Sequence, residues 1–234
     1  MTVRHVFLDD GGTINDNARR EPQWRRLDGE APAWSEANRR SFAPVFERFR
    51  RRVAAWEDGR SDYRRELELY GLDWLGSMAT EVGVELPPDE AARLALVAAA
   101  NAYIAPRVRA DYPGVVEASR ALAADFTLFT ASGTASRDLG LILGGLGVAG
   151  RFETLYGPDL VNTPKGHGRF YARLFADAGV DPTACLVLDD SGASLLAARS
   201  AGARVLLVAE ASTDGLPHIA ALRDLPALLK ALNP

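Results

Sequence analysis

The sequence predicts an α/β protein with a parallel sheet core and an inserted all-helical domain. Beyond about residue 111, short β-prone runs alternate with helical stretches, whereas residues 34–104 show helical periodicity alone. One further strand precedes that helical block, so the block interrupts the sheet domain. We therefore expect a Rossmann-like parallel sheet core formed by residues 1–14 and 111–234, with a helical cap domain at 15–110.

The first strand is expected in the run RHVFLDD, which ends in two carboxylates, Asp9 and Asp10. Buried carboxylates are costly unless they are paired or bind a cation, so this pair needs a local reason. Gly11 and Gly12 follow directly, and Asp-Gly pairs are also ordinary turn formers. Taken alone, the stretch is compatible with a plain turn or with a functional site.

The helical block is predicted from apolar residues three and four positions apart. Phe42, Val45, Phe46 and Phe49 follow this spacing, and residues 63–78 continue it in a second helix. A third helix should follow the Pro-Pro pair before Asp89, because prolines and acids favour a helix start.

Four more strands are expected at residues 125–131, 153–157, 184–190 and 204–210, each separated from the next by a helical stretch. Ligands of open parallel sheets bind beyond the carboxyl ends of the strands. The chain places carboxylates, hydroxyls and a loop lysine there, which suits a divalent metal and a phosphate. These residues are Asp9, Asp10, Thr130, Ala131, Ser132, Lys165, Asp189 and Asp190.

Composition narrows the partners. The net charge of −4 argues against nucleic acid or an anionic membrane as the main partner. Cys185 is the sole cysteine, which excludes an internal disulfide and a multi-cysteine metal site. With no signal peptide pattern and no apolar run of membrane-spanning length, we expect a soluble cytoplasmic protein, monomeric or homodimeric.

The ordered set of motifs resembles the haloacid dehalogenase superfamily of hydrolases, whose members use an aspartate nucleophile. VFLDDGGTI resembles the first motif, with Asp9 as the nucleophile, and FTLFTAS resembles the second, with Thr130. Residues 163–203 are similar to the third and fourth motifs, with Lys165 as the cation and Asp189-Asp190 as the acidic pair. The helical block stands where this superfamily carries its cap.

The resemblance implies a magnesium-dependent phosphatase that acts through an aspartyl-phosphate on Asp9. Mg²⁺ would be bound by Asp9, the backbone carbonyl of Gly11 and Asp190. Lys165 and Thr130 would contact the transferred phosphoryl group. Further substrate contacts are expected from Ala131, Ser132 and Asn15, and support of the ligands from behind is expected from Asp189 and Ser194. The implied partner is a small phosphorylated metabolite.

One position departs from that pattern. Two residues after the nucleophile, superfamily phosphatases carry a second aspartate that acts as acid and base, whereas this chain has Gly11. Acid-base catalysis should therefore be weakened. Asp10 is a poor substitute, because successive residues at a strand end point apart.

The same departure keeps two alternatives open. One is a 2-haloacid dehalogenase-like enzyme, although Asp189-Asp190 would repel a carboxylate substrate unless a metal neutralised the pair. The other is a catalytically impaired protein that binds a phosphorylated ligand without turning it over.

Overall fold

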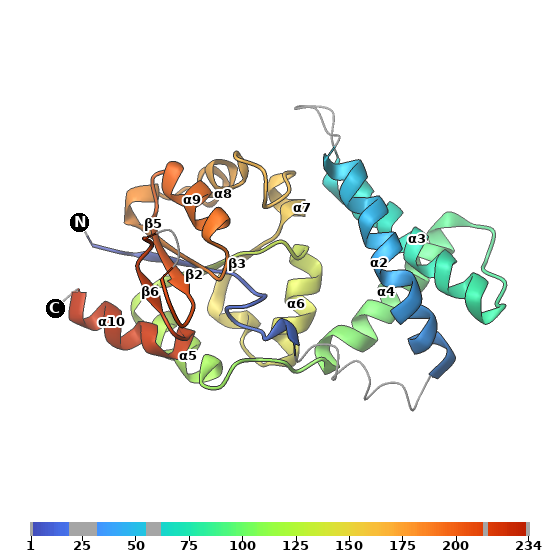
Figure 1. The fold of residues 1–234 in the computed structure, drawn as a ribbon, viewed down its shortest axis with the longest axis horizontal. Coiled ribbons are helices and arrows are strands. Elements are labelled where there is room, and N and C mark those ends of the chain that lie inside the picture. The colour runs from blue at the N-terminus through green and yellow to red at the C-terminus, as the bar shows by residue number, and fades with distance from the viewer. Residues whose placement is uncertain (1, 19–31, 55–61, 213–214, 233–234) are drawn as a thin grey trace.

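The computed structural model describes residues 2–18, 32–54, 62–212 and 215–232 (Figure 1). Its sheet has six parallel strands in the order β3-β2-β1-β4-β5-β6. The strands are β1 (His5–Leu8), β2 (Thr127–Ala131), β3 (Phe152–Tyr156), β4 (Cys185–Asp189), β5 (Arg204–Val208) and β6 (His218–Ile219). The predicted α/β fold is confirmed. The short edge strand β6 was not predicted, because two residues carry no periodic signal.

Helices cover both faces of the sheet (Figure 1). They are α5 (Val115–Asp125), α6 (Ser136–Gly145), α7 (Pro158–Val161), α8 (Phe170–Ala178), α9 (Gly192–Ser200) and α10 (Leu225–Leu232). Single 3-10 turns occur at η1 (Ala105–Arg107), η2 (Ala149–Arg151), η3 (Pro182–Ala184) and η4 (Leu222–Asp224).

Two apolar clusters hold these layers together, one on each face of the sheet. Leu8 of β1 packs in the cluster that includes α5 and α10, whereas Phe7 packs in the cluster that includes α8 and α9. This alternation is the period of two that a strand imposes on its side chains. Because β1 is covered on both faces and lies between β2 and β4, its carboxyl end is fixed in space.

The inserted block forms three helices, α2 (Pro32–Ala54), α3 (Tyr63–Val82) and α4 (Glu90–Ile104). They share a small core that includes Val45, Trp74 and Val97. Phe42 and Phe46 have the same helical spacing as the core residues but are 49% and 41% exposed, and their rings stack on each other. The helical cap is confirmed, while its exact limits at 15–110 stay a prediction.

The two chain segments that link this block to the sheet pair with each other. Asp16 N donates to the Ala110 carbonyl at 2.8 Å, and Tyr112 N donates to the Ile14 carbonyl at 3.0 Å. Entry to and exit from the block are therefore held side by side. None of the described helices is long and apolar enough to span a membrane.

A second contact joins the block to the sheet domain. Asn162, which ends α7, has a left-handed backbone with φ of +47°. Its side-chain oxygen accepts a hydrogen bond of 2.8 Å from the backbone N–H of Tyr63, the first residue of α3. That N–H has no acceptor within its own helix, because it lies in the first turn.

We expect Asn162→Gly to release this contact without disturbing the backbone, since glycine adopts a positive φ freely. The Tyr63 amide should then exchange its hydrogen with solvent at least about tenfold faster. Residue-resolved hydrogen exchange measures this. Asn162→Asp keeps an acceptor oxygen and should keep the protection; unchanged exchange in the glycine variant would contradict the prediction.

Candidate active site

The carboxyl ends of β1 and β4 bring three carboxylates together. In the parallel register Leu8 pairs with Leu188, and Asp9 N donates to the Leu188 carbonyl at 3.0 Å. Asp9 therefore lies beside Asp189, and Asp190 follows. One oxygen of each of these three carboxylates lies within 4.8 Å of the other two. We call Asp9, Asp189 and Asp190 the carboxylate cluster.

Lys165 reaches this cluster from the loop between α7 and α8. Its Nζ lies 2.8 Å from Asp9 Oδ1 and 2.8 Å from Asp189 Oδ2. The other oxygen of Asp189 accepts a hydrogen bond of 2.9 Å from the backbone N–H of Ser191. With both of its oxygens engaged, Asp189 holds Lys165 against Asp9, while its support of a bound metal stays a prediction.

Burial dominates the electrostatics of the site. It raises the pKa of Asp9 to about 6; Lys165 opposes this increase, and Asp189 adds to it. Burial also raises the pKa of Asp189 and that of Asp190. Burial lowers the pKa of Lys165, but the charges of Asp9 and Asp189 outweigh it and leave that pKa raised. One ammonium thus faces three carboxylates.

This imbalance fits a divalent cation. Carboxylate oxygens are the hard ligands that Mg²⁺ prefers. Asp190 is exposed, so a cation could reach the cluster from solvent. Asp9 and Asp190 would hold the ion, with the expected carbonyl of Gly11 as a further ligand.

The loop after β1 is shaped by Gly12, whose φ is +81°. A side chain there would begin 1.9 Å from Asp190 Oδ2, so only glycine lets this carboxylate approach the loop. The carbonyl of Asp10 accepts hydrogen bonds from the N–H groups of Ile14 and Asn15, at 2.9 and 2.8 Å. The turn is therefore present, and it lies directly beside the carboxylate cluster, so the two interpretations that the sequence left open do not exclude each other.

Asn15 is fully buried, and its Nδ2 donates to Asp10 Oδ1 at 2.6 Å. The structure thus places Asn15 inside the loop, where it fixes the turn. It does not place Asn15 at a surface that a substrate could reach.

The second motif lies at the carboxyl end of β2. Thr130 pairs with Leu8, one residue before Asp9, and its hydroxyl donates to the Tyr156 carbonyl of β3 at 3.0 Å. The contact of this hydroxyl with a transferred phosphoryl group stays a prediction. Ala131 and Ser132 are buried at the end of β2, and Ser132 Oγ accepts a hydrogen bond from Thr134 N.

Ser194 lies in the first turn of α9. Its backbone N–H donates to the Oγ of Ser191, which caps this helix. His167 is exposed and accepts a hydrogen bond from Arg169 N through Nδ1, so it is turned into its own loop. Arg19 and Arg20 follow the first motif in the sequence and are candidates for binding a second anionic group of the substrate, but they lie outside the described residues.

Tyr171 is a site residue that the sequence analysis missed. It is fully buried in α8, and its hydroxyl donates to Asp189 Oδ2 at 3.4 Å. Burial and the charges of Asp189 and Asp9 raise its pKa, so it stays a neutral donor. Its position in the helix that follows Lys165 could have indicated this contact, but the same position is equally typical of a residue in the apolar core.

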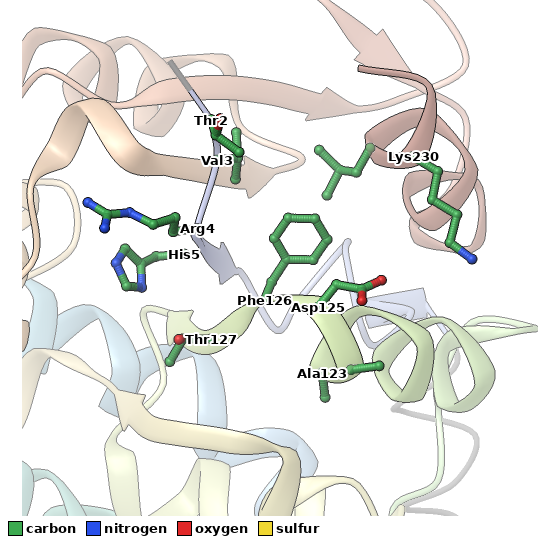
Figure 2. A pocket seen from close by; sticks show the side chains of 11 residues that line it. Thr2, Val3, Arg4, His5, Ala123, Asp125, Phe126, Thr127 and Lys230 are labelled. Atoms are coloured by element: carbon green, nitrogen blue, oxygen red, sulfur yellow. The ribbon is translucent and has the colours of Figure 1, made fainter. Parts of the chain in front are cut away.

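A cavity of about 750 Å³ lies at the amino-terminal ends of β1 and β2. Figure 2 shows the side chains that line it. It is lined by Arg4 and His5 at the start of β1, by Thr127 at the start of β2, and by Lys230 of α10. The carboxylate cluster lies at the other ends of these strands, so this cavity is not part of it.

Fold and site together define a capped α/β hydrolase with an aspartate at the central strand. The chain belongs to the haloacid dehalogenase-like hydrolases, whose family model matches residues 3–202. No curated protein matches the chain significantly in sequence.

Solved structures share the fold over almost the whole chain. The L-2-haloacid dehalogenase from Xanthobacter autotrophicus with chloropropionic acid covalently bound is 20% identical, with a TM-score of 0.64 and coverage of 99% of this chain and 100% of that one. The 2-haloacid dehalogenase from Pseudomonas syringae is also 20% identical, with a TM-score of 0.66 and coverage of 99% and 100%. The hydrolase YfnB from Bacillus subtilis, bound to magnesium, is 14% identical, with a TM-score of 0.62 and coverage of 98% and 99%. At these identities the likeness shows the fold alone.

The raised pKa of Asp9 predicts how the metal-free protein responds to pH. The folded state holds a proton on Asp9 more tightly than the unfolded state does, so the free energy of unfolding falls as pH rises from about 4 to about 6. Asp9→Asn cannot ionise and escapes this loss. In a chelator we expect its stability advantage over the wild type to grow by about 2 kcal/mol from pH 4 to pH 7.5.

Denaturant unfolding at several pH values measures this difference. Asp181→Asn is the matched control: hydrogen bonds from Thr183 lower the pKa of Asp181, so this variant should lose stability relative to the wild type above pH 4. A pH-independent difference for Asp9→Asn would show that Asp9 is not destabilised by its surroundings.

Proposed function

We propose that the protein is a Mg²⁺-dependent hydrolase that takes the phosphoryl group of a small phosphorylated metabolite onto Asp9. The observation that carries this proposal is the carboxylate cluster itself. Three carboxylates within 4.8 Å of one another, paired with a single lysine, are suited to a divalent cation together with an anionic substrate. The magnesium bound to the similar hydrolase from Bacillus subtilis supports the choice of metal.

In this reaction a carboxylate oxygen of Asp9 forms a bond to phosphorus while the bond to the leaving oxygen breaks. Water then hydrolyses the aspartyl-phosphate and regenerates Asp9. Lys165 offsets negative charge on the nucleophile, and Asp189 with Tyr171 holds this ammonium in place. Bound Mg²⁺ would neutralise charge on the phosphoryl oxygens.

A second candidate is favoured by the comparisons. Seven of the similar structures carry the name dehalogenase, among them the enzyme with chloropropionic acid covalently bound. In this alternative Asp9 displaces halide from the carbon next to a carboxylate. The comparisons support this reaction better than phosphate hydrolysis, whereas the uncompensated charge of the cluster opposes a carboxylate substrate.

One experiment separates these reactions. We expect the purified protein to release phosphate from activated aryl phosphates and phosphorylated metabolites, with loss of release on chelation of Mg²⁺. Asp9→Asn should lower this rate by about 10³-fold or more, because the nucleophile is lost. Halide release from L-2-chloropropionate is measured in parallel, with and without Mg²⁺.

Asp224→Asn is the matched control, because Asp224 is an exposed carboxylate of η4 that pairs only weakly with Arg223. Halide release that needs Asp9 and ignores Mg²⁺ would replace the phosphatase by the dehalogenase. Phosphate binding with neither release would favour the third reading, a binding protein without turnover.

A further inference from the structure

The space beside Gly11 is filled by another residue. A side chain at position 11 would begin 2.8 Å from Oδ1 and 2.9 Å from Nδ2 of Asn17. The carboxamide of Asn17 therefore lies where the side chain two residues beyond the nucleophile would extend. Asn17 is exposed, so this carboxamide also faces solvent.

Asp16 holds Asn17 in this position. Its backbone N–H donates to the Ala110 carbonyl at 2.8 Å, and its Oδ1 accepts a hydrogen bond of 2.9 Å from Ala18 N. The backbone on both sides of Asn17 is thus tied down, which keeps the Cα of Asn17 next to Gly11.

The next residue, Gly12, lies against Asp190, one of the carboxylates proposed to bind the metal. Gly12 is covered by Asp190 in the same way that Gly11 is covered by Asn17. A neutral amide and a carboxylate of the cluster therefore cover two consecutive residues of the loop that begins at Asp9. The amide therefore lies against Gly11, one residue from the glycine that Asp190 covers and two residues from Asp9 along the loop.

We propose that the Asn17 carboxamide donates a hydrogen bond to the leaving-group oxygen of the substrate. This inference rests on the proposed phosphoryl transfer to Asp9. An amide does not release a proton near neutral pH, so the leaving group departs with the electron pair of the broken P–O bond as an anion. The substrate class is therefore phosphate compounds with weakly basic leaving groups, such as acyl phosphates and aryl or enol phosphates.

A series of aryl phosphates with leaving groups of increasing pKa tests the assignment. In the wild type, kcat/KM should fall steeply along the series, by roughly tenfold for each pKa unit. Asn17→Ala should lose about tenfold throughout, the worth of one hydrogen bond. Asn17→Asp places a carboxylic acid at the same point and should raise the rate of the most basic leaving groups by about 10²-fold or more.

The pH dependence of kcat/KM distinguishes a hydrogen bond to the leaving group from a purely structural role of Asn17, because a structural role would not change it. With a basic leaving group, Asn17→Asp should gain an alkaline limb where its new carboxyl group loses its proton, while the wild type has none there. The double variant Gly11→Asp with Asn17→Gly places a carboxylic acid at position 11 and removes the carboxamide that would clash with it. It should likewise make kcat/KM depend less steeply on the pKa of the leaving group. Asn101→Asp makes the same chemical change on α4 and should leave the series unchanged.

Two failures are distinguishable. If the wild type shows no Asp9-dependent phosphate release from any member of the series, the proposed function and this assignment fall together. If the wild type turns over but neither carboxyl variant changes the dependence on leaving group or the pH profile, the assignment of Asn17 is wrong and the proposed function stands.

Discussion

The site depends on one ion-pair arrangement, the ammonium of Lys165 held between Asp9 and Asp189. Each contact is 2.8 Å long, and all three side chains are nearly excluded from solvent. A buried charge is tolerated only with a partner, so this lysine makes it possible to keep the Asp9 carboxylate at the end of the central strand. Asp190 then adds a charge that Lys165 does not balance. The remaining negative charge attracts a cation and repels an anion that binds without one.

How far the sequence predicted this site follows from what parallel sheets impose. The order of strands and helices was enough to place four residues together at the carboxyl ends of the strands, because neighbouring parallel strands end on the same side of the sheet. These residues are Asp9, Lys165, Asp189 and Asp190. The strand register was not readable, and it decides that Thr130 bonds the β3 backbone. Burial was not readable either, so the roles of Asn15 and Tyr171 emerged only in three dimensions.

The fold alone is compatible with either of the two proposed reactions, and the charge of the carboxylate cluster is what distinguishes them. The nucleophile of either reaction would be the same aspartate on the same strand, so a likeness of folds cannot separate the two. The two reactions differ in the charge of the substrate that would approach the carboxylate cluster. In the proposed reaction a divalent cation would offset the charge of Asp190 beside Gly12, whereas a haloacid carboxylate without a cation would meet that charge directly.

The two glycines of the first motif make room for different side chains. Gly12 gives its side-chain space to Asp190 on the core side, and Gly11 gives its space to Asn17. Residues 10–15 are tied to one another by the hydrogen bonds of the turn, while Asn17 lies past the point where Asp16 pairs with Ala110. The polar group beside the nucleophile thus comes from the segment that leads into the helical block. The core thus supplies the carboxylates of Asp9 and Asp190, and the segment after Asp16 supplies the amide that lies against Gly11.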